Sequence, residues 1–190
     1  MIRFAEGPKP EAFGDEETSG NAWLASHPTG RPTDRWSTFK PQLADGFRSL
    51  CAYSAMHEPV GTVDHFVSCD EDRSKAYCWA NYRFASGWIN SSKQNLRSEQ
   101  VVDPFDVHDD WFELLLPSLQ LVATDQVPAE WKERVTTMLI RLHLRDDERV
   151  IRQRQAWYRL YQAGDLTLEG LEKLAPLIAA AVRRRSAQSG

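Results

Sequence analysis

The chain has 190 residues, of which 42% are hydrophobic and 26% charged, and its formal net charge is −4 at pH 7. These values are typical of a globular protein with a sizeable core, and they exclude a protein that is basic over its whole surface, so a nucleic-acid site would have to be a local patch. No apolar run reaches the length of a membrane span and the first residues lack a secretory signal, so we expect a cytoplasmic protein without membrane contact.

Residues 1–34 are predicted to form an irregular N-terminal arm. They are rich in Gly, Pro, Ser, Thr and Glu and show little hydrophobic periodicity. A helix is expected next, because Trp36, Phe39, Leu43 and Phe47 fall on one helical face.

The rest of the region 35–100 has the pattern strand, turn, strand, loop, helix. Strands are predicted at 50–54 and 60–67, with a turn that contains Pro and Gly between them. The polar residues 68–76 should form an exposed loop, and a short helix should begin near Asn90.

Residues 101–190 are predicted to be mostly helical. Apolar periodicity indicates helices from Pro128 through Leu142, over 147–162, and from Thr167 to the arginines that follow Val182. The segment 111–117 could be a strand or a buried helix. The whole chain is therefore predicted to be an α+β protein.

An Asp-His pair, two asparagines and a lysine in the central region suggest a one-metal phosphodiesterase. Asp64 and Asn90 can supply oxygen ligands to Mg²⁺ or Mn²⁺, and His65 can take a proton from water. Adjacent strand residues point to opposite faces, so Asp64 and His65 can serve one site only at a strand end or a bulge.

The stretch from Val63 to Lys93 resembles the HNH, or ββα-metal, endonuclease motif: an Asp-His hairpin, a loop, an asparagine, and a helix with a lysine after its first motif residue. The resemblance implies a central ββα-metal module with an N-terminal helix and a C-terminal helical bundle. It implies that His65 is the general base and that Asn81 orients its imidazole. The metal ligands would be Asp64 and Asn90.

Phosphate contacts are implied for the basic side chains of the same stretch, which are Lys93, Arg83 and Arg97. The implied activity is hydrolysis of DNA by a metal-dependent endonuclease.

The chain is also similar to small stand-alone bacterial HNH proteins of anti-phage defence, some of which pair with an ATPase or another sensor protein. Those proteins usually hold structural zinc through two Cys-x-x-Cys pairs. Here the corresponding positions are Cys51 with Ser54, and Ser86 with Ile89, so structural zinc is not expected.

Other interpretations of these residues stay open. His65 could be a hydrogen-bonded core histidine, Asn81 a turn residue, and Asn90 a helix N-cap. The arginines could be solvated surface charges. At the level of function, the alternatives are a noncatalytic adaptor on a degenerate HNH scaffold, or an RNase that uses the same site, because no residue is an evident reader of the 2′-hydroxyl group.

Overall fold

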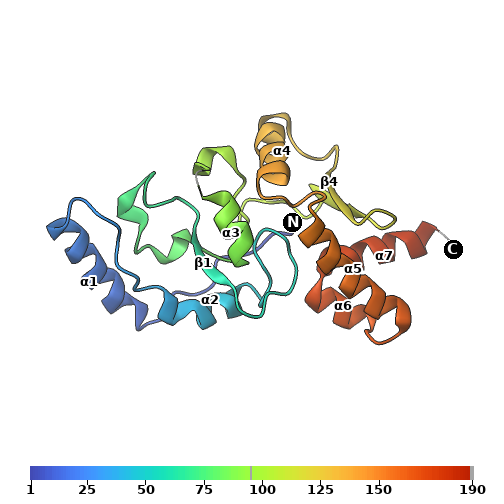
Figure 1. Ribbon diagram of the computed structural model, residues 1–190, viewed down its shortest axis with the longest axis horizontal. Coiled ribbons are helices and arrows are strands. Elements are labelled where there is room, and N and C mark those ends of the chain that lie inside the picture. The colour runs from blue at the N-terminus through green and yellow to red at the C-terminus, as the bar shows by residue number, and fades with distance from the viewer. Residues whose placement is uncertain (95, 189–190) are drawn as a thin grey trace.

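The computed structural model describes residues 1–94 and 96–188, and within them the chain is an α+β protein with two small antiparallel sheets (Figure 1). Its helices are α1 Phe13–Ser26, α2 Lys40–Gly46, α3 Gly87–Lys93, α4 Lys132–Arg141, α5 Glu148–Ala163, α6 Leu168–Leu174 and α7 Pro176–Gln188. Its strands are β1 Thr62–His65, β2 Tyr82–Ala85, β3 Phe112–Leu115 and β4 Gln120–Ala123. Within the described ranges, no helix combines the length and the apolar character that a membrane span requires.

The N-terminal arm is not irregular, because residues 13–26 form helix α1. Only Phe13 and Gly20 of this helix are buried, so its sequence lacks the apolar stripe by which a helix is usually predicted. Phe13 packs edge-on against Phe39 and Tyr82. A β-carbon at Gly20 would lie 2.5 Å from the Tyr77 ring, so the absence of a side chain there lets the helix approach closely.

The predicted helical face after residue 35 is confirmed, since Phe39, Leu43 and Phe47 are all buried. The prediction of a strand at 50–54 is wrong. That segment contributes only an isolated bridge between Leu50 and His57. Strand β1 pairs instead with β2, which sequence reasoning had not assigned as a strand.

Helix α3 follows β2 directly and lies against β1 (Figure 1). It begins at Gly87, earlier than predicted, with Ser86 in the N-cap position. Asn90 is therefore inside the helix, and the interpretation of this residue as an N-cap is wrong. The observed order is strand, loop, strand, helix, and Ile89 lies on the buried face of this helix.

The second half of the chain is mostly helical, as predicted, but it also contains the hairpin of β3 and β4, which makes segment 111–117 a strand in its central part. The single helix expected after Thr167 is divided into α6 and α7. Pro176, which has no backbone N–H, begins α7, and Ala175 before it is not helical.

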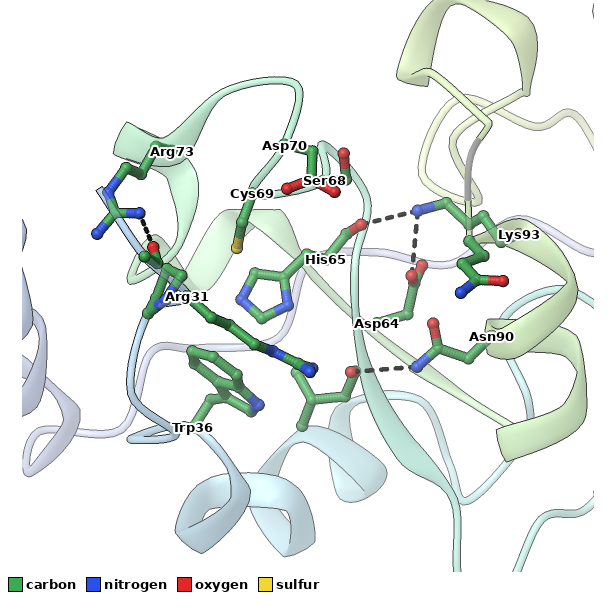
Figure 2. Close-up of a pocket in the computed structure, with 14 residues that line it drawn as sticks. Arg31, Trp36, Asp64, His65, Ser68, Cys69, Asp70, Arg73, Asn90 and Lys93 are labelled. Atoms are coloured by element: carbon green, nitrogen blue, oxygen red, sulfur yellow. Dashed lines mark hydrogen bonds and ion pairs between the residues drawn. The ribbon is translucent and has the colours of Figure 1, made fainter. Parts of the chain in front are cut away.

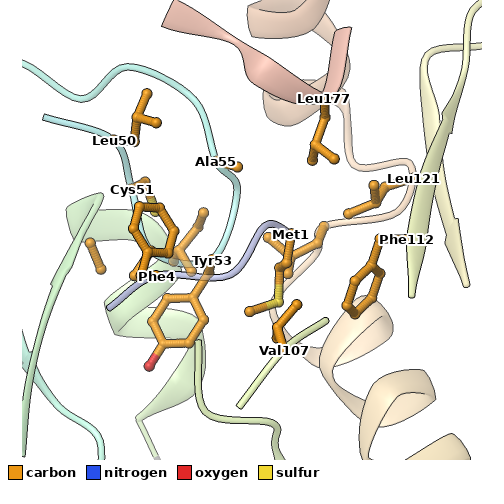
Figure 3. Close-up of a cluster of buried hydrophobic side chains, with 14 of the residues drawn as sticks. Met1, Phe4, Leu50, Cys51, Tyr53, Ala55, Val107, Phe112, Leu121 and Leu177 are labelled. Carbon is orange, nitrogen blue, oxygen red and sulfur yellow. The ribbon is translucent and has the colours of Figure 1, made fainter. Parts of the chain in front are cut away.

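The N-terminal residues join the two halves of the core. Met1 and Phe4 are buried. Figure 3 shows Met1 with Tyr53 of the first half on one side and Phe112 and Leu121 of the second sheet on the other.

Arg154 of α5 is a buried charge that organises the second half. Its side chain is 1% exposed and donates hydrogen bonds to the carbonyl oxygens of Leu119, Leu144 and Arg145. Burial lowers the pKa of Arg154 to about 10, so the guanidinium stays protonated at neutral pH. It ties the turn between β3 and β4 to the connection between α4 and α5.

Arg154→Met should lower the free energy of unfolding by about 3 kcal/mol, because the substitution leaves buried carbonyl groups without donors. Urea unfolding followed by circular dichroism measures this change. Arg152→Met is the matched control on the same helix. Arg152 is exposed and, among the described residues, pairs with Glu148 alone, so its loss should lower the free energy of unfolding by less than about 0.5 kcal/mol. Equal effects of the two substitutions would contradict the structural role of Arg154.

Candidate functional site

An open pocket of about 700 Å³ lies at the end of β1, bounded by α3, the loop after β1 and the segment before α2 (Figure 2). The side chains proposed for catalysis and metal binding, His65, Asp64 and Asn90, line this pocket, and Lys93 does too. Arg83, Arg97 and Asn81 do not line it. The pocket thus brings together four of the seven predicted site residues.

His65 is held between two aromatic rings and one backbone carbonyl. The rings of Trp36 and Tyr82 meet its imidazole edge-on, with centroid distances of 4.5 and 4.9 Å. Its Nε2 lies 2.9 Å from the Ala76 carbonyl oxygen. Since a carbonyl can only accept, Nε2 carries the hydrogen, and in the neutral ring Nδ1 has a free lone pair.

The electrostatics of His65 favour that neutral form. Burial lowers the pKa of the imidazole below its ordinary value, although the hydrogen bond to Ala76 acts in the opposite direction. No hydrogen bond to Nδ1 is found among the described residues. The ring therefore has the properties of a general base at neutral pH.

Asp64 and His65 follow the alternation of a strand and still share the pocket, because β1 ends at this point. Figure 2 shows Asp64 directed toward α3 and His65 directed toward Trp36. Asp64 is 3% exposed and accepts hydrogen bonds from Tyr53 Oη at 2.5 Å and Lys93 Nζ at 3.0 Å. Burial, and then the Asp64 carboxylate, raises the pKa of Tyr53 well above its ordinary value, so its hydroxyl remains a donor.

Lys93 is an internal cation in this structure. Besides Asp64, its ammonium group donates to the carbonyl oxygens of His65 at 2.7 Å and Phe66 at 2.9 Å, and the residue is 3% exposed. The predicted phosphate contact is therefore replaced by a contact that holds α3 to the end of β1.

The buried position of Arg83 also differs from the prediction of a phosphate contact, whereas Arg97 is exposed and its phosphate contact stays a prediction. Arg83 is 3% exposed, forms a bidentate ion pair with Asp103, and stacks over the Phe105 ring at 3.7 Å. Arg97 is exposed, but it lies outside the pocket and pairs with Glu99 at 3.4 Å. The polar contacts of Arg83 are thus used within the fold.

The prediction that Asn81 binds the imidazole of His65 is wrong, because the Asn81 side chain forms its hydrogen bonds with the backbone of Val67 and Lys75. Its amide nitrogen donates to the carbonyl oxygens of Val67 and Lys75, and its amide oxygen accepts from the Val67 N–H group. These bonds close the loop that leads to Ala76. Asn81 therefore positions His65 through the backbone, by fixing the carbonyl that receives the Nε2 hydrogen.

Asn90 and Asp64 provide oxygen atoms on one wall of the pocket. The Asn90 amide nitrogen donates to Thr62 Oγ1 at 3.0 Å and to the Val63 carbonyl at 3.4 Å, which leaves the amide oxygen free of these contacts. Figure 2 shows this oxygen on the side of Asp64. One carboxylate and one amide oxygen fit a hard divalent cation that takes its other ligands from water and substrate.

Several pocket residues had no assigned role in the sequence interpretation. Arg31, Cys69 and Arg73 line the pocket. Tyr53 supports Asp64 from the opposite side. A buried tyrosine needs a hydrogen-bond partner for its hydroxyl, and this requirement is the feature of the sequence that could have indicated a role for Tyr53. No pattern in the sequence indicated a role for Arg31.

The chain was compared with protein-family models and with curated proteins, and neither comparison gave a match. The chemistry of the pocket therefore follows from its own residues.

In protein kept free of metal with EDTA, an NMR titration of His65 should give a pKa below the ordinary value of about 6.5, with the hydrogen of the neutral ring on Nε2. The resonance is assigned by its loss in His65→Gln. A protonated ring at pH 7, or a hydrogen on Nδ1, would contradict the assignment of His65 as a base.

The same pKa shift affects stability. Because the folded protein binds a proton at His65 less readily than the unfolded chain does, its stability should fall as the pH drops below about 6.5. Thermal unfolding at pH 7 and pH 5 measures this effect, and His65→Gln should lose less stability over that interval. An equal loss in both proteins would assign the pH dependence to other groups.

Proposed function

We propose that this protein is a metal-dependent endonuclease of the HNH type that hydrolyses phosphodiester bonds in DNA. The observation that carries the proposal is the state of His65. Its Nε2 is tied to Ala76, no described residue forms a hydrogen bond to its Nδ1, and His65 lines the same open pocket as Asp64 and Asn90. A noncatalytic adaptor would have no need of an unpaired imidazole nitrogen next to two oxygen ligands.

In the proposed reaction, His65 Nδ1 takes a proton from a water molecule as the water oxygen attacks phosphorus. The bond from phosphorus to the leaving oxygen then breaks, and that oxygen receives a proton from solvent. The hydrogen bond from Nε2 to Ala76 keeps the ring oriented while it becomes positively charged. Trp36 and Tyr82 restrict the rotation of the ring by packing against it.

Asp64 and Asn90 would hold a divalent cation, Mg²⁺ or Mn²⁺, on the wall next to His65. When bound, the cation would act as a Lewis acid that neutralises charge on the phosphate and on the leaving oxygen. Tyr53 keeps the Asp64 carboxylate oriented through its short hydrogen bond. Asn90 is oriented by Thr62 and Val63.

Lys93 limits how strongly the cation binds to the free protein. Its ammonium group neutralises Asp64 and would repel a second positive charge nearby. A substrate phosphate adds negative charge and ligand oxygens, so binding of the cation and of the nucleic acid should be mutually favourable.

The proposal of DNA as the substrate rests on the resemblance alone. The pocket residues named so far would act on the phosphate, which DNA and RNA share, so they do not distinguish the two polymers. The ATPase or sensor partner and the role in phage defence remain predictions of the resemblance. An RNase with the same site is the alternative that the cleavage assay must address.

His65→Ala should reduce metal-dependent cleavage by at least about 100-fold, because the attacking water loses its base. Cleavage of supercoiled plasmid and of labelled RNA, with EDTA, Mg²⁺ or Mn²⁺, measures the effect. Arg152→Ala is the control, since Arg152 is an exposed residue of α5 outside the pocket. Full activity in the His65 variant would overturn the proposal, and cleavage of RNA alone would change the substrate.

Lys93→Met should destabilise the protein by about 3 kcal/mol in EDTA, because Asp64 stays buried without its cation. Mn²⁺ should restore part of this loss by taking the place of the ammonium group, and it should stabilise the variant more than the natural protein. Thermal unfolding with EDTA or Mn²⁺ measures both effects.

Two comparisons make that result specific. Asp64→Asn combined with Lys93→Met should show no added stabilisation by Mn²⁺, because the carboxylate ligand is gone. Arg97→Met removes an exposed positive charge and should respond to Mn²⁺ as the natural protein does. If Lys93→Met gains nothing from Mn²⁺, Asp64 is not a metal ligand.

A further inference from the structure

One wall of the pocket is formed by residues 27–36, which we call the strap. It connects α1 to the segment that precedes α2, and Gly30, Arg31, Pro32 and Trp36 face the pocket. Sequence reasoning placed most of this segment in an irregular arm. The structure holds it by specific contacts at both ends.

Arg73 fixes the first part of the strap. Its guanidinium group donates to the carbonyl oxygens of His27 and Thr29, at 2.8 and 3.5 Å, and also to that of Gly30. It lies over the Trp23 ring as well, 5.6 Å from the centroid. The donors of Arg73 are therefore directed to the backbone of the strap and not to the pocket.

The second part of the strap is fixed by three further contacts. Tyr77 donates its hydroxyl hydrogen to the Thr33 carbonyl oxygen at 2.9 Å. Asp34 accepts from the N–H and hydroxyl groups of Ser37. Arg35 pairs with Glu16 of α1 at 2.7 Å.

Arg31, between these two anchored parts, has no hydrogen bond or ion pair with any described residue. Its side chain is exposed, and Figure 2 shows it extending from the strap into the pocket that His65 and Trp36 also line. The other cations of this region are engaged: Lys93 with Asp64, Arg83 with Asp103, and Arg73 with the strap. Arg31 is thus a positive charge that lines the pocket without an ion pair to any described residue.

We propose that Arg31 binds a backbone phosphate of the nucleic-acid substrate beside the bond that is cut. A guanidinium group offers paired donors that match the oxygen atoms of a phosphate, and the anchored strap reduces the entropy lost when the contact forms. The inference rests on the proposed function, because it assumes that the ligand of the pocket is a nucleic acid. It assigns substrate binding to a segment outside the stretch from Val63 to Lys93.

Binding is measured with a fluorescently labelled DNA duplex, by anisotropy in Mg²⁺, and with His65→Ala as the background so that the duplex stays intact. Adding Arg31→Ala should weaken binding about tenfold. It should also reduce the slope of log affinity against log salt by about 0.9, the contribution of one phosphate contact. Arg31→Lys keeps the charge without the paired donors and should lose less affinity.

Arg152→Ala in the same background is the control. It also removes one exposed positive charge, but Arg152 lies on α5, where it pairs with Glu148, outside the pocket and the strap. Its affinity should stay within about twofold of the background, and its salt slope should be unchanged. Thermal unfolding of each variant checks that the fold is retained.

The outcomes separate the two proposals. If the natural protein cleaves DNA but Arg31→Ala binds with unchanged affinity and salt slope, the role of Arg31 is overturned and the nuclease stands. If Arg31→Ala weakens binding although the natural protein cleaves neither DNA nor RNA, the phosphate contact stands and the nuclease is overturned. If the His65→Ala background does not bind the duplex, the role of Arg31 is overturned. Equal losses for Arg31→Ala and Arg152→Ala would also overturn it, because only net charge would then matter.

Discussion

The buried ion pair of Lys93 and Asp64 is the contact on which the pocket depends. It joins the last turn of α3 to the end of β1, and the same ammonium group also binds the carbonyl oxygens of His65 and Phe66. Those carbonyls lie where the strand stops and pairing with β2 is no longer available to every backbone group. Lys93 therefore provides hydrogen bonds both to the Asp64 carboxylate and to the backbone carbonyls at the end of β1. These bonds offset part of the free energy needed to bury the two charges.

The position of His65 depends in turn on the loop that begins after this ion pair. Asn81 fastens both ends of the loop through its side-chain amide, and Ala76 supplies the carbonyl that fixes the imidazole tautomer. Tyr82 contributes twice, because its ring packs on the imidazole while its hydroxyl donates to the same Ala76 carbonyl at 2.8 Å. Because this backbone carbonyl accepts from two donors, it is held in place, and the fold therefore sets the orientation of the imidazole.

The secondary structure could be predicted from the sequence where the apolar residues recur at a regular spacing. The helical face of Phe39, Leu43 and Phe47 was predicted because its apolar residues recur at helical spacing. The strand β2 was missed because Tyr82–Ala85 is short and buried at every position, so it shows no alternation. Helix α1 was missed for the opposite reason, since too few of its residues are buried to produce a pattern.

The candidate site was predictable in its residue types but not in all of their contacts. The Asp64–His65 pair and Asn90 do line one pocket, because the end of a strand and the helix next to it meet there. Whether a lysine or an arginine is buried depends on neighbours distant in sequence. Asp103, which pairs with Arg83, comes from the segment before β3, and Tyr53, which supports Asp64, comes from a turn before β1.

The charges that line the pocket are compatible with the proposed polyanionic substrate although the net charge of the chain is −4. The Asp64 carboxylate is neutralised by Lys93, so it does not present a full negative charge to a ligand. Asp70 also lines the pocket, and Figure 2 shows it near Cys69 and Ser68, away from Asn90. Arg31 also lines the pocket and forms no ion pair with a described residue. At distances of a few ångströms, and partly shielded from water, such local charges outweigh the net charge of the whole surface.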